Sequence, residues 1–171
     1  MNETAAPIIV SALFGDADFA FFNGLRRQHF PPERNVIDAH LTLFHHLPPS
    51  IAGELKHRLD AETRDAPQPK ARLSGIMSLG RGVAFRIDSP DLAVIRNGLA
   101  DAFSGLLTPQ DQQGWRPHVT IQNKVEPAEA KRLLAELSAD FRPRPVDISG
   151  IACWYYRGGP WESLSRHMFA R

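Results

Sequence analysis

Two short stretches of the chain carry residue types that can transfer protons. A histidine two positions before a threonine occurs in His40-Leu41-Thr42, and the same pattern recurs in His118-Val119-Thr120. A neutral imidazole takes up a proton at about pH 6.5, so one histidine of a pair can be protonated while the other is not. A hydroxyl beside each imidazole can hydrogen-bond an anion. Two such pairs facing each other could therefore act on both ends of a phosphate ester, one as base and one as acid.

Each pattern lies in a run of alternating apolar residues, which is typical of a half-buried strand. Residues two apart on a strand point to the same face. We therefore expect His40 and Thr42 to share one face of their strand, with Leu41 and Leu43 behind them. In the second run the same rule places His118 and Thr120 on one face, with Val119 and Ile121 on the other.

The same alternation extends the set of candidate substrate-binding residues. Phe44 is expected on the His40 face, where an aromatic ring could stack on a base, with His46 beside it and His45 on the opposite face. Packing in the core is the alternative for Phe44. Further along the chain, the candidates are Arg116 and Lys124 as phosphate-binding cations on the His118 face, and Tyr156 and Trp161 as part of a cleft wall. Solvated strand ends or hairpin packing are the alternatives for these four.

The rest of the chain alternates between strand-like and helix-like patterns. Strands are expected over residues 7–14, 39–46, 71–79, 83–87, 116–124, 146–154 and 161–169. Helices are expected after Asp16, after Ser50, and from Pro90 and Pro127 onward, because apolar residues recur there every three or four positions. Polar loops over residues 28–35 and 108–114 lead into the two motif strands.

Both halves of the chain, about 1–80 and 81–171, show the order strand, helix, His-x-Thr strand, helix, strand. If the halves fold alike, a pseudo-twofold axis would bring the motif strands together and face their histidines across a central cleft. A chain of 171 residues is long enough for one well-buried domain, and no Pro/Gly/Ser linker separates the halves. We therefore predict an α+β fold with a single bilobal domain over residues 1–171.

Composition and net charge narrow the classes of partner and the cellular compartment that fit this protein. A net charge of +1 argues against tight nonspecific binding to long nucleic acid. The lone cysteine, Cys153, cannot form an intrachain disulfide, which fits a reducing compartment. Residues 1–14 lack a basic leader, so we expect a first strand there and no signal peptide. No run approaches the length of a membrane span. These features predict a cytoplasmic protein that does not bind membranes, a monomer with no protein partner implied.

At these motifs the sequence resembles the two-histidine (2H) phosphoesterases, which include the 2′-5′ RNA ligase-like proteins and cyclic phosphodiesterases. The resemblance rests on the paired His-x-Thr motifs, and the segments 116–125 and 154–162 look like the bacterial branch of that family. It implies a two-lobed α+β fold, no cofactor, and catalytic roles for His40, Thr42, His118 and Thr120. His45 departs from the aromatic residue often found at its position, which weakens any transfer of the family's base-stacking platform.

The chemistry that follows is metal-independent cleavage of a 2′,3′-cyclic or 2′-5′ phosphodiester at an RNA end or in a small nucleotide, reversible as 2′-5′ ligation. For hydrolysis we expect His118 to act as base and His40 as acid, with the threonine hydroxyls holding phosphate oxygens. A catalytic zinc site is less favoured because neither motif offers a third ligand nearby. A Ser-His-Asp hydrolase lacks its nucleophile-elbow sequence. A non-catalytic RNA- or nucleotide-binding module using the same cleft remains the alternative.

Overall fold

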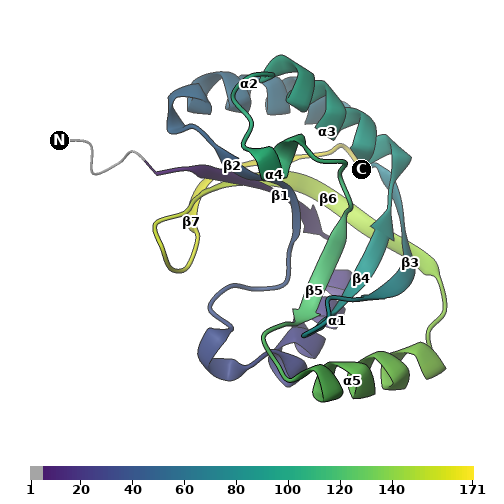
Figure 1. Ribbon diagram of the computed structural model, residues 1–171. Helices are drawn as coiled ribbons and strands as arrows, with labels where there is room; N and C mark the ends of the chain where they lie inside the picture. Colours follow the sequence, from purple (N-terminus) through teal and green to yellow (C-terminus); the bar gives the residue numbers. More distant parts are fainter. Residues whose placement is uncertain (1–5) are drawn as a thin grey trace.

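The computed structural model describes residues 6–171, and its strands and helices follow the expected order (Figure 1). The first half contains β1 Ile8–Phe14, α1 Asp16–His29, β2 Leu41–Leu47, α2 Ala52–Thr63 and β3 Lys70–Ser78. The second half contains β4 Val83–Asp88, α3 Pro90–Ala102, α4 Pro109–Gln112, β5 His118–Gln122, α5 Pro127–Ala139, β6 Arg144–Tyr155 and β7 Glu162–Met168. Short 3₁₀ turns, Pro32–Arg34 and Pro49–Ile51, precede β2 and α2. Residues 1–5, the start of the segment expected to carry no signal peptide, lie outside the described residues.

All strand pairs within the sheet are antiparallel. The strands pair in the order β1-β2-β5-β4-β3-β6-β7, and an additional pairing between β1 and β6 closes a ring. The long strand β6 is shared, because residues 144–147 pair with β3 while residues 148–155 pair with β1. The motif strands β2 and β5 are joined by one residue pair, Leu41 opposite Val119. The sheet is thus two-lobed, with β6 continuous between the lobes and a thin connection on the motif side.

The helices cover the two lobes on opposite sides of the molecule (Figure 1). Helices α2 and α3 lie together on one side, where α2 packs against β6 and β7 and α3 against β3. On the other side α1 packs against β5, and α5 against β3 and β4. Helix α1 comes from the first half of the chain but packs on a strand of the second half. The two spatial lobes therefore do not coincide with the two sequence halves.

The apolar positions of both motif strands lie in one continuous core. Leu41 and Leu43 of β2, like Val119 and Ile121 of β5, are 0% exposed. Burying each of these side chains stabilises the fold by roughly 1.5–3 kcal/mol relative to leaving it in water. The alternation around each His-x-Thr motif is as expected, so core packing fixes the face on which the polar residues emerge.

A β-bulge in β2 changes the alternation after Thr42. The neighbours Val10 and Ser11 of β1 pair with Phe44 and Thr42, so that β2 carries one extra residue between them. Phe44 therefore turns into the core and is 0% exposed. The expectation that Phe44 shares the His40 face is wrong, because the extra residue reverses the alternation at Phe44, and a second register shift restores it before Leu47. His45, which was expected on the face opposite His40, is exposed instead.

A second irregularity lies at the end of β5. Val83 and Ala84 of β4 pair with Gln122 and Thr120, which leaves one extra residue in β5. Gln122 is consequently buried, at 2% exposed, and does not emerge on the face that carries His118. The strand ends there, and Lys124 adopts a left-handed backbone with φ 67°. Lys124 is exposed and has left the line of the strand.

Candidate active site

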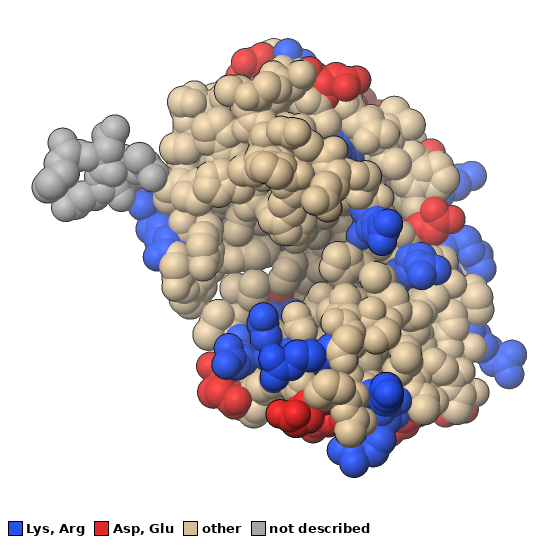
Figure 2. All heavy atoms as spheres, viewed as in Figure 1, with Lys and Arg blue, Asp and Glu red and all other residues tan. Residues whose placement is uncertain are grey.

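A cavity of about 590 Å³ opens between the two motif strands. All four motif side chains line this cavity. His40 immediately precedes β2 and Thr42 lies on it, whereas His118 and Thr120 both lie on β5. Figure 2 shows a hollow on this face, whose surroundings are largely uncharged, with Lys and Arg atoms nearby. The fold thus brings together two imidazoles and two hydroxyls that lie far apart in the sequence.

Both motif histidines are held by the same local hydrogen bond. His40 Nδ1 lies 2.9 Å from the Asp38 carbonyl oxygen, and His118 Nδ1 lies 2.7 Å from the Arg116 carbonyl oxygen. A carbonyl can only accept, so Nδ1 carries the hydrogen and donates it in each ring. Nε2 is then the nitrogen available to a ligand, either as a base or, when protonated, as an acid. Both rings are prepared for proton transfer in the same way.

The environment of His40 strongly favours its neutral form. Burial, helped by the positive charges of Arg26 and His118, lowers the pKa of His40 to about 4, against the opposing hydrogen bond to Asp38. The ring also lies against Trp161, with centroids 4.6 Å apart. One edge of His40 remains partly open to the cavity. At neutral pH and without ligand, this imidazole is therefore neutral.

Buried arginines brace the motif strands from the helices. Arg26 of α1 donates to the Thr120 carbonyl oxygen at 2.9 Å, and Arg96 of α3 donates to the Leu43 carbonyl oxygen at 3.2 Å. The two arginines are 4% and 6% exposed. Burial lowers the pKa of Arg26 to about 10, against the opposing charge of Asp38, so it stays charged at neutral pH. A helix from each half of the chain thereby holds the motif strand of the other half.

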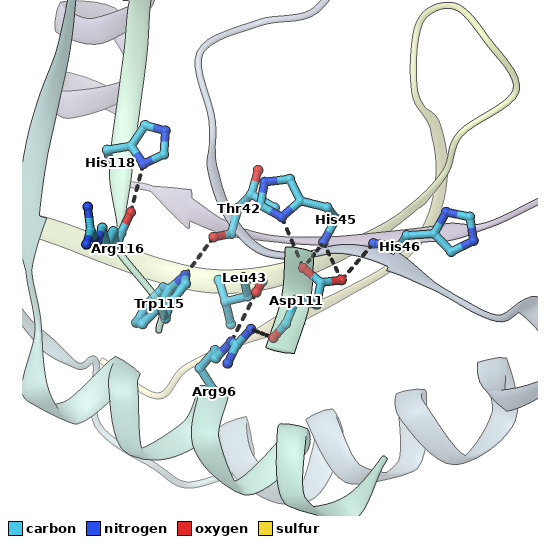
Figure 3. A network of polar contacts seen from close by, with 9 residues as sticks. All are labelled: Thr42, Leu43, His45, His46, Arg96, Asp111, Trp115, Arg116 and His118. Atoms are coloured by element: carbon cyan, nitrogen blue, oxygen red, sulfur yellow. Dashed lines mark hydrogen bonds and ion pairs between the residues drawn. The ribbon is translucent and has the colours of Figure 1, made fainter. Parts of the chain in front are cut away.

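A third group of residues at the site was not expected from the sequence (Figure 3). Asp111 of α4 is 1% exposed and hydrogen-bonds the ring of His45, which lines the cavity. Trp115 donates from Nε1 to the Thr42 carbonyl oxygen at 3.0 Å. The segment 108–114 was expected to be a polar loop, and it contains the short helix α4 instead. Its contacts with β2 join residues distant in sequence, so no local pattern reveals them.

The other candidate binding residues separate into three groups. Arg116 and Trp161 line the cavity, as expected for substrate contacts. Lys124 and Tyr156 are exposed, and neither lines it. Phe44 lies in the core under the guanidinium of Arg96, whose central carbon is 4.5 Å from the ring centroid. Neither a bulge nor a strand end is visible in residue alternation, which explains the misplaced side chains.

A second cavity of about 510 Å³ adjoins the first and shares His40 and Trp161 with it. Its wall includes the aromatic side chains of Phe14, Phe19, Trp154 and Trp161. The rings of Trp154 and Trp161 have centroids 6.1 Å apart. The cavity between the motif strands therefore continues past His40 into this second cavity, which we call the aromatic pocket.

The described part of the chain offers neither a metal cluster nor a membrane span. Within residues 6–171, no group of three or more His, Cys, Asp or Glu side chains is arranged to hold a metal ion. Over the same residues, no helix has the length and apolar character needed to cross a bilayer. The four motif residues thus make up a site of imidazoles and hydroxyls.

Solved structures of other proteins share this fold. A structure of TT0787 of Thermus thermophilus matches with a TM-score of 0.66 at 15% identity, covering 95% of this chain and 97% of that one. E. coli LigT complexed with 3′-AMP matches with a TM-score of 0.63 at 17% identity, covering 98% and 99%. A structure titled phosphoesterase matches with a TM-score of 0.60 at 18% identity, covering 98% and 99%. These likenesses show the fold.

Among curated proteins, no sequence matches this chain significantly. The family model of the 2′-5′ RNA ligase superfamily, by contrast, matches residues 14–160, which include both motif strands. The chain belongs to the 2′-5′ RNA ligase superfamily, the 2H phosphoesterases.

Proposed function

We propose that the protein is a metal-independent phosphodiesterase that acts on 2′,3′-cyclic or 2′-5′ phosphodiesters of RNA ends or small nucleotides. The observation that carries the proposal is the matched pair of imidazoles, His40 and His118. Each donates Nδ1–H to a backbone carbonyl and lines one cavity together with a motif threonine. Such a pair can remove a proton on one side of a phosphate and supply one on the other.

The reaction needs no group beyond these side chains and water. The basic histidine takes a proton from water at Nε2 while the water oxygen bonds to phosphorus. The bond between phosphorus and the leaving oxygen breaks, and the acidic histidine gives its Nε2 proton to that oxygen. Thr42 and Thr120 hydrogen-bond the non-bridging oxygens, whose charge is redistributed in the transition state. In 2′-5′ ligation a 5′-hydroxyl takes the place of water: it gives its proton to the basic histidine and bonds to phosphorus, while the 3′-oxygen of the cyclic ester leaves with the proton of the acidic histidine.

The low pKa of His40 bears on which histidine is the base. An imidazole with a pKa of about 4 is neutral at pH 7 and can accept a proton from water. This favours His40 as the base in hydrolysis and leaves the acid role to His118, the reverse of the expectation from the sequence. A bound phosphate favours the charged imidazole, so the pKa of His40 rises when substrate binds.

The aromatic pocket beyond His40 supports a nucleoside as one part of the substrate. Bases stack on aromatic side chains, and Trp161 stands between the two cavities. E. coli LigT, which shares the fold, has been crystallised with 3′-AMP, NADP⁺ and ATP. A nucleotide whose phosphate lies between the histidines and whose base lies against Trp161 fits both cavities.

The deciding experiment is a substrate screen with purified protein in the presence of EDTA. The panel contains 2′,3′-cyclic nucleotides, 2′-5′-linked dinucleotides and RNA with a cyclic-phosphate end, assayed in both directions. We expect turnover of at least one class, undiminished by EDTA. Activity that EDTA abolishes and Zn²⁺ or Mn²⁺ restores would replace the proposal with a metallohydrolase. Nucleotide binding without turnover at any pH would replace it with a binding module.

Monomeric state and a cytoplasmic location remain predictions from the sequence. The single cysteine, Cys153, is buried, and burial raises the pKa of its thiol to about 11, so it is an unreactive thiol. Light scattering on the purified protein measures the oligomeric state directly.

A further inference from the structure

Asp111 and His45 form a pair that the proposed reaction does not use (Figure 3). The carboxylate accepts Nδ1–H of the His45 ring at 3.0 Å. It also accepts the backbone N–H of His45, at 2.9 Å and 3.0 Å to its two oxygens, and that of His46 at 3.0 Å. Asp111 is 1% exposed, so these donors replace the water that the carboxylate has lost.

The carboxylate is ionised despite its burial. Burial alone would raise its pKa, but the hydrogen bonds from the ring and backbone of His45 and the backbone of His46 keep the pKa of Asp111 below its usual range. The Arg96 guanidinium donates to the Asp111 backbone carbonyl at 2.6 Å and holds α4 against β2. The ring of His45 thus has a fixed carboxylate on one side.

The opposite edge of the His45 ring belongs to the cavity. Because Nδ1 donates to Asp111, Nε2 is the nitrogen available to a ligand, as in His40 and His118. The His45 side chain is 43% exposed, whereas its carboxylate partner is buried. Anchoring α4 needs only the two backbone N–H donors. The ring adds a positioned, ligand-facing imidazole that this anchoring does not require.

His45 lies beyond the phosphate position defined by Thr42. The bulge makes His45 the next polar residue of β2 after Thr42 to line the cavity, and three residues of strand span at most about 10 Å. Two glutamines of the α4 segment, Gln110 and Gln113, line the cavity as well. The side-chain amides of these glutamines can donate hydrogen bonds to an anion that lies beside the one held by the motif threonines.

We propose that His45, positioned by Asp111, is a second phosphate-binding point of the cleft. It binds a phosphate group of the substrate other than the one being cleaved. Phosphate binding at Nε2 uses the imidazolium form of the ring, whose charge the Asp111 carboxylate at 3.0 Å balances. The inference rests on the proposed function for its substrate class, and it selects nucleotides or RNA ends that carry an additional phosphate.

The test compares two substrates that differ by one phosphate, adenosine 2′,3′-cyclic phosphate with and without a 5′-phosphate. We expect wild type to prefer the 5′-phosphorylated compound by about tenfold in kcat/KM, the value of a hydrogen bond to a charged group. The loss in His45→Gln is expected to be about tenfold larger on the 5′-phosphorylated substrate than on the other. His46→Gln is the matched control, because His46 is the exposed neighbour and contributes only its backbone to the pair. It keeps the wild-type preference.

Binding gives a readout that does not depend on turnover. Adenosine 5′-monophosphate and adenosine are titrated while the imidazole NMR signals are followed, and we expect only the former to shift His45. Asp111→Asn is expected to weaken this binding, and the melting temperature of each variant controls for loss of folding. Equal losses of His45→Gln on both substrates, or no preference in wild type, would overturn the inference. Binding of the monophosphate at His45 without any phosphodiester turnover would refute the proposed function alone.

Discussion

His40 and His118 share one hydrogen-bonding arrangement, while the proposed function gives them opposite tasks. In both rings the backbone fixes the tautomer, so the difference between acid and base comes from the surroundings. Around His40 those surroundings are burial, Trp161, and the charges of Arg26 and His118. At the scale of single residues, desolvation is the main cause that lowers the pKa of His40.

Replacing either motif histidine is expected to remove turnover without removing the fold. His40→Ala and His118→Ala each lose at least about 10²-fold in kcat, since each removes one partner of acid–base catalysis. KM changes far less, because acid and base act mainly in the transition state. Steady-state kinetics beside circular dichroism measure both effects, with His46→Gln as control. Retention of more than about a tenth of wild-type kcat by either variant would contradict paired catalysis.

The pH dependence of kcat/KM, which reports on the free protein, is expected to differ from that of kcat, which reports on the complex. Below a pH of about 4, His40 is protonated in the free protein and cannot act as base, so kcat/KM falls there. In the complex the bound phosphate raises that pKa, so the acidic limb of kcat lies at higher pH than the acidic limb of kcat/KM.

The pH dependence of the residual activity in His40→Ala and His118→Ala shows which histidine causes the acidic limb of the profile and which causes the basic limb. His40→Ala loses the acidic limb if His40 is the base, and His118→Ala then loses the basic limb. The opposite result would restore the assignment expected from the sequence. A flat profile between about pH 3 and 9, with chemistry rate-limiting, would exclude the mechanism.

At the scale of elements, helices control where the motif strands lie. Arg26 and Arg96 reach from α1 and α3 to carbonyl groups of β5 and β2. These contacts use backbone acceptors inside or next to the motifs, so they can position the motif threonines through the backbone. The guanidinium of Arg26 also donates to Asn35 at 2.8 Å in the loop that leads to His40. One helix residue therefore connects both motifs.

Arg26→Met is expected to reduce kcat more than it raises KM, and to lower the free energy of unfolding by about 1–3 kcal/mol through unpaired buried acceptors. Arg27→Met is the matched control, since Arg27 is the exposed neighbour on the same helix. Thermal melts and steady-state kinetics measure both quantities. Equal behaviour of the two variants would show that the brace has no role in positioning.

Residue alternation predicted the elements well and their irregularities poorly. The apolar periodicity of β2 and β5 placed His40, Thr42, His118 and Thr120 together, because the buried leucines and valines determine the face. The same rule misplaced Phe44, because a bulge inserts one extra residue into a strand and the sequence carries no local signal of it. Helix α4 escaped prediction because the bonds between Asp111 and β2 join distant segments.

At the scale of the whole molecule, the lobes are interleaved. β6 pairs with strands of both lobes, and α1 packs on β5 across the division between the sequence halves. Each half alone would leave much of the core exposed. The bilobal protein is therefore expected to behave as one cooperative unit and not as two linked domains.

Fragments 1–80 and 81–171 are accordingly expected to be unfolded when expressed separately. Mixing them is expected to restore native circular dichroism and turnover, because the strand pairings between them are extensive. The intact chain is expected to show one unfolding transition. Independent folding of either fragment, or two transitions in the intact protein, would contradict a single domain.

The single residue pair between β2 and β5 has a consequence for motion. With only Leu41 opposite Val119, the two motif imidazoles are carried by segments whose relative position is weakly restrained on this side. A phosphate bound by Thr42 and Thr120 adds a second connection across the gap. Bound nucleotide is therefore expected to slow amide hydrogen exchange in β2 and β5 together, and mass spectrometry of exchanged peptides measures it. Slower exchange confined to one strand would show that the substrate does not bridge the lobes.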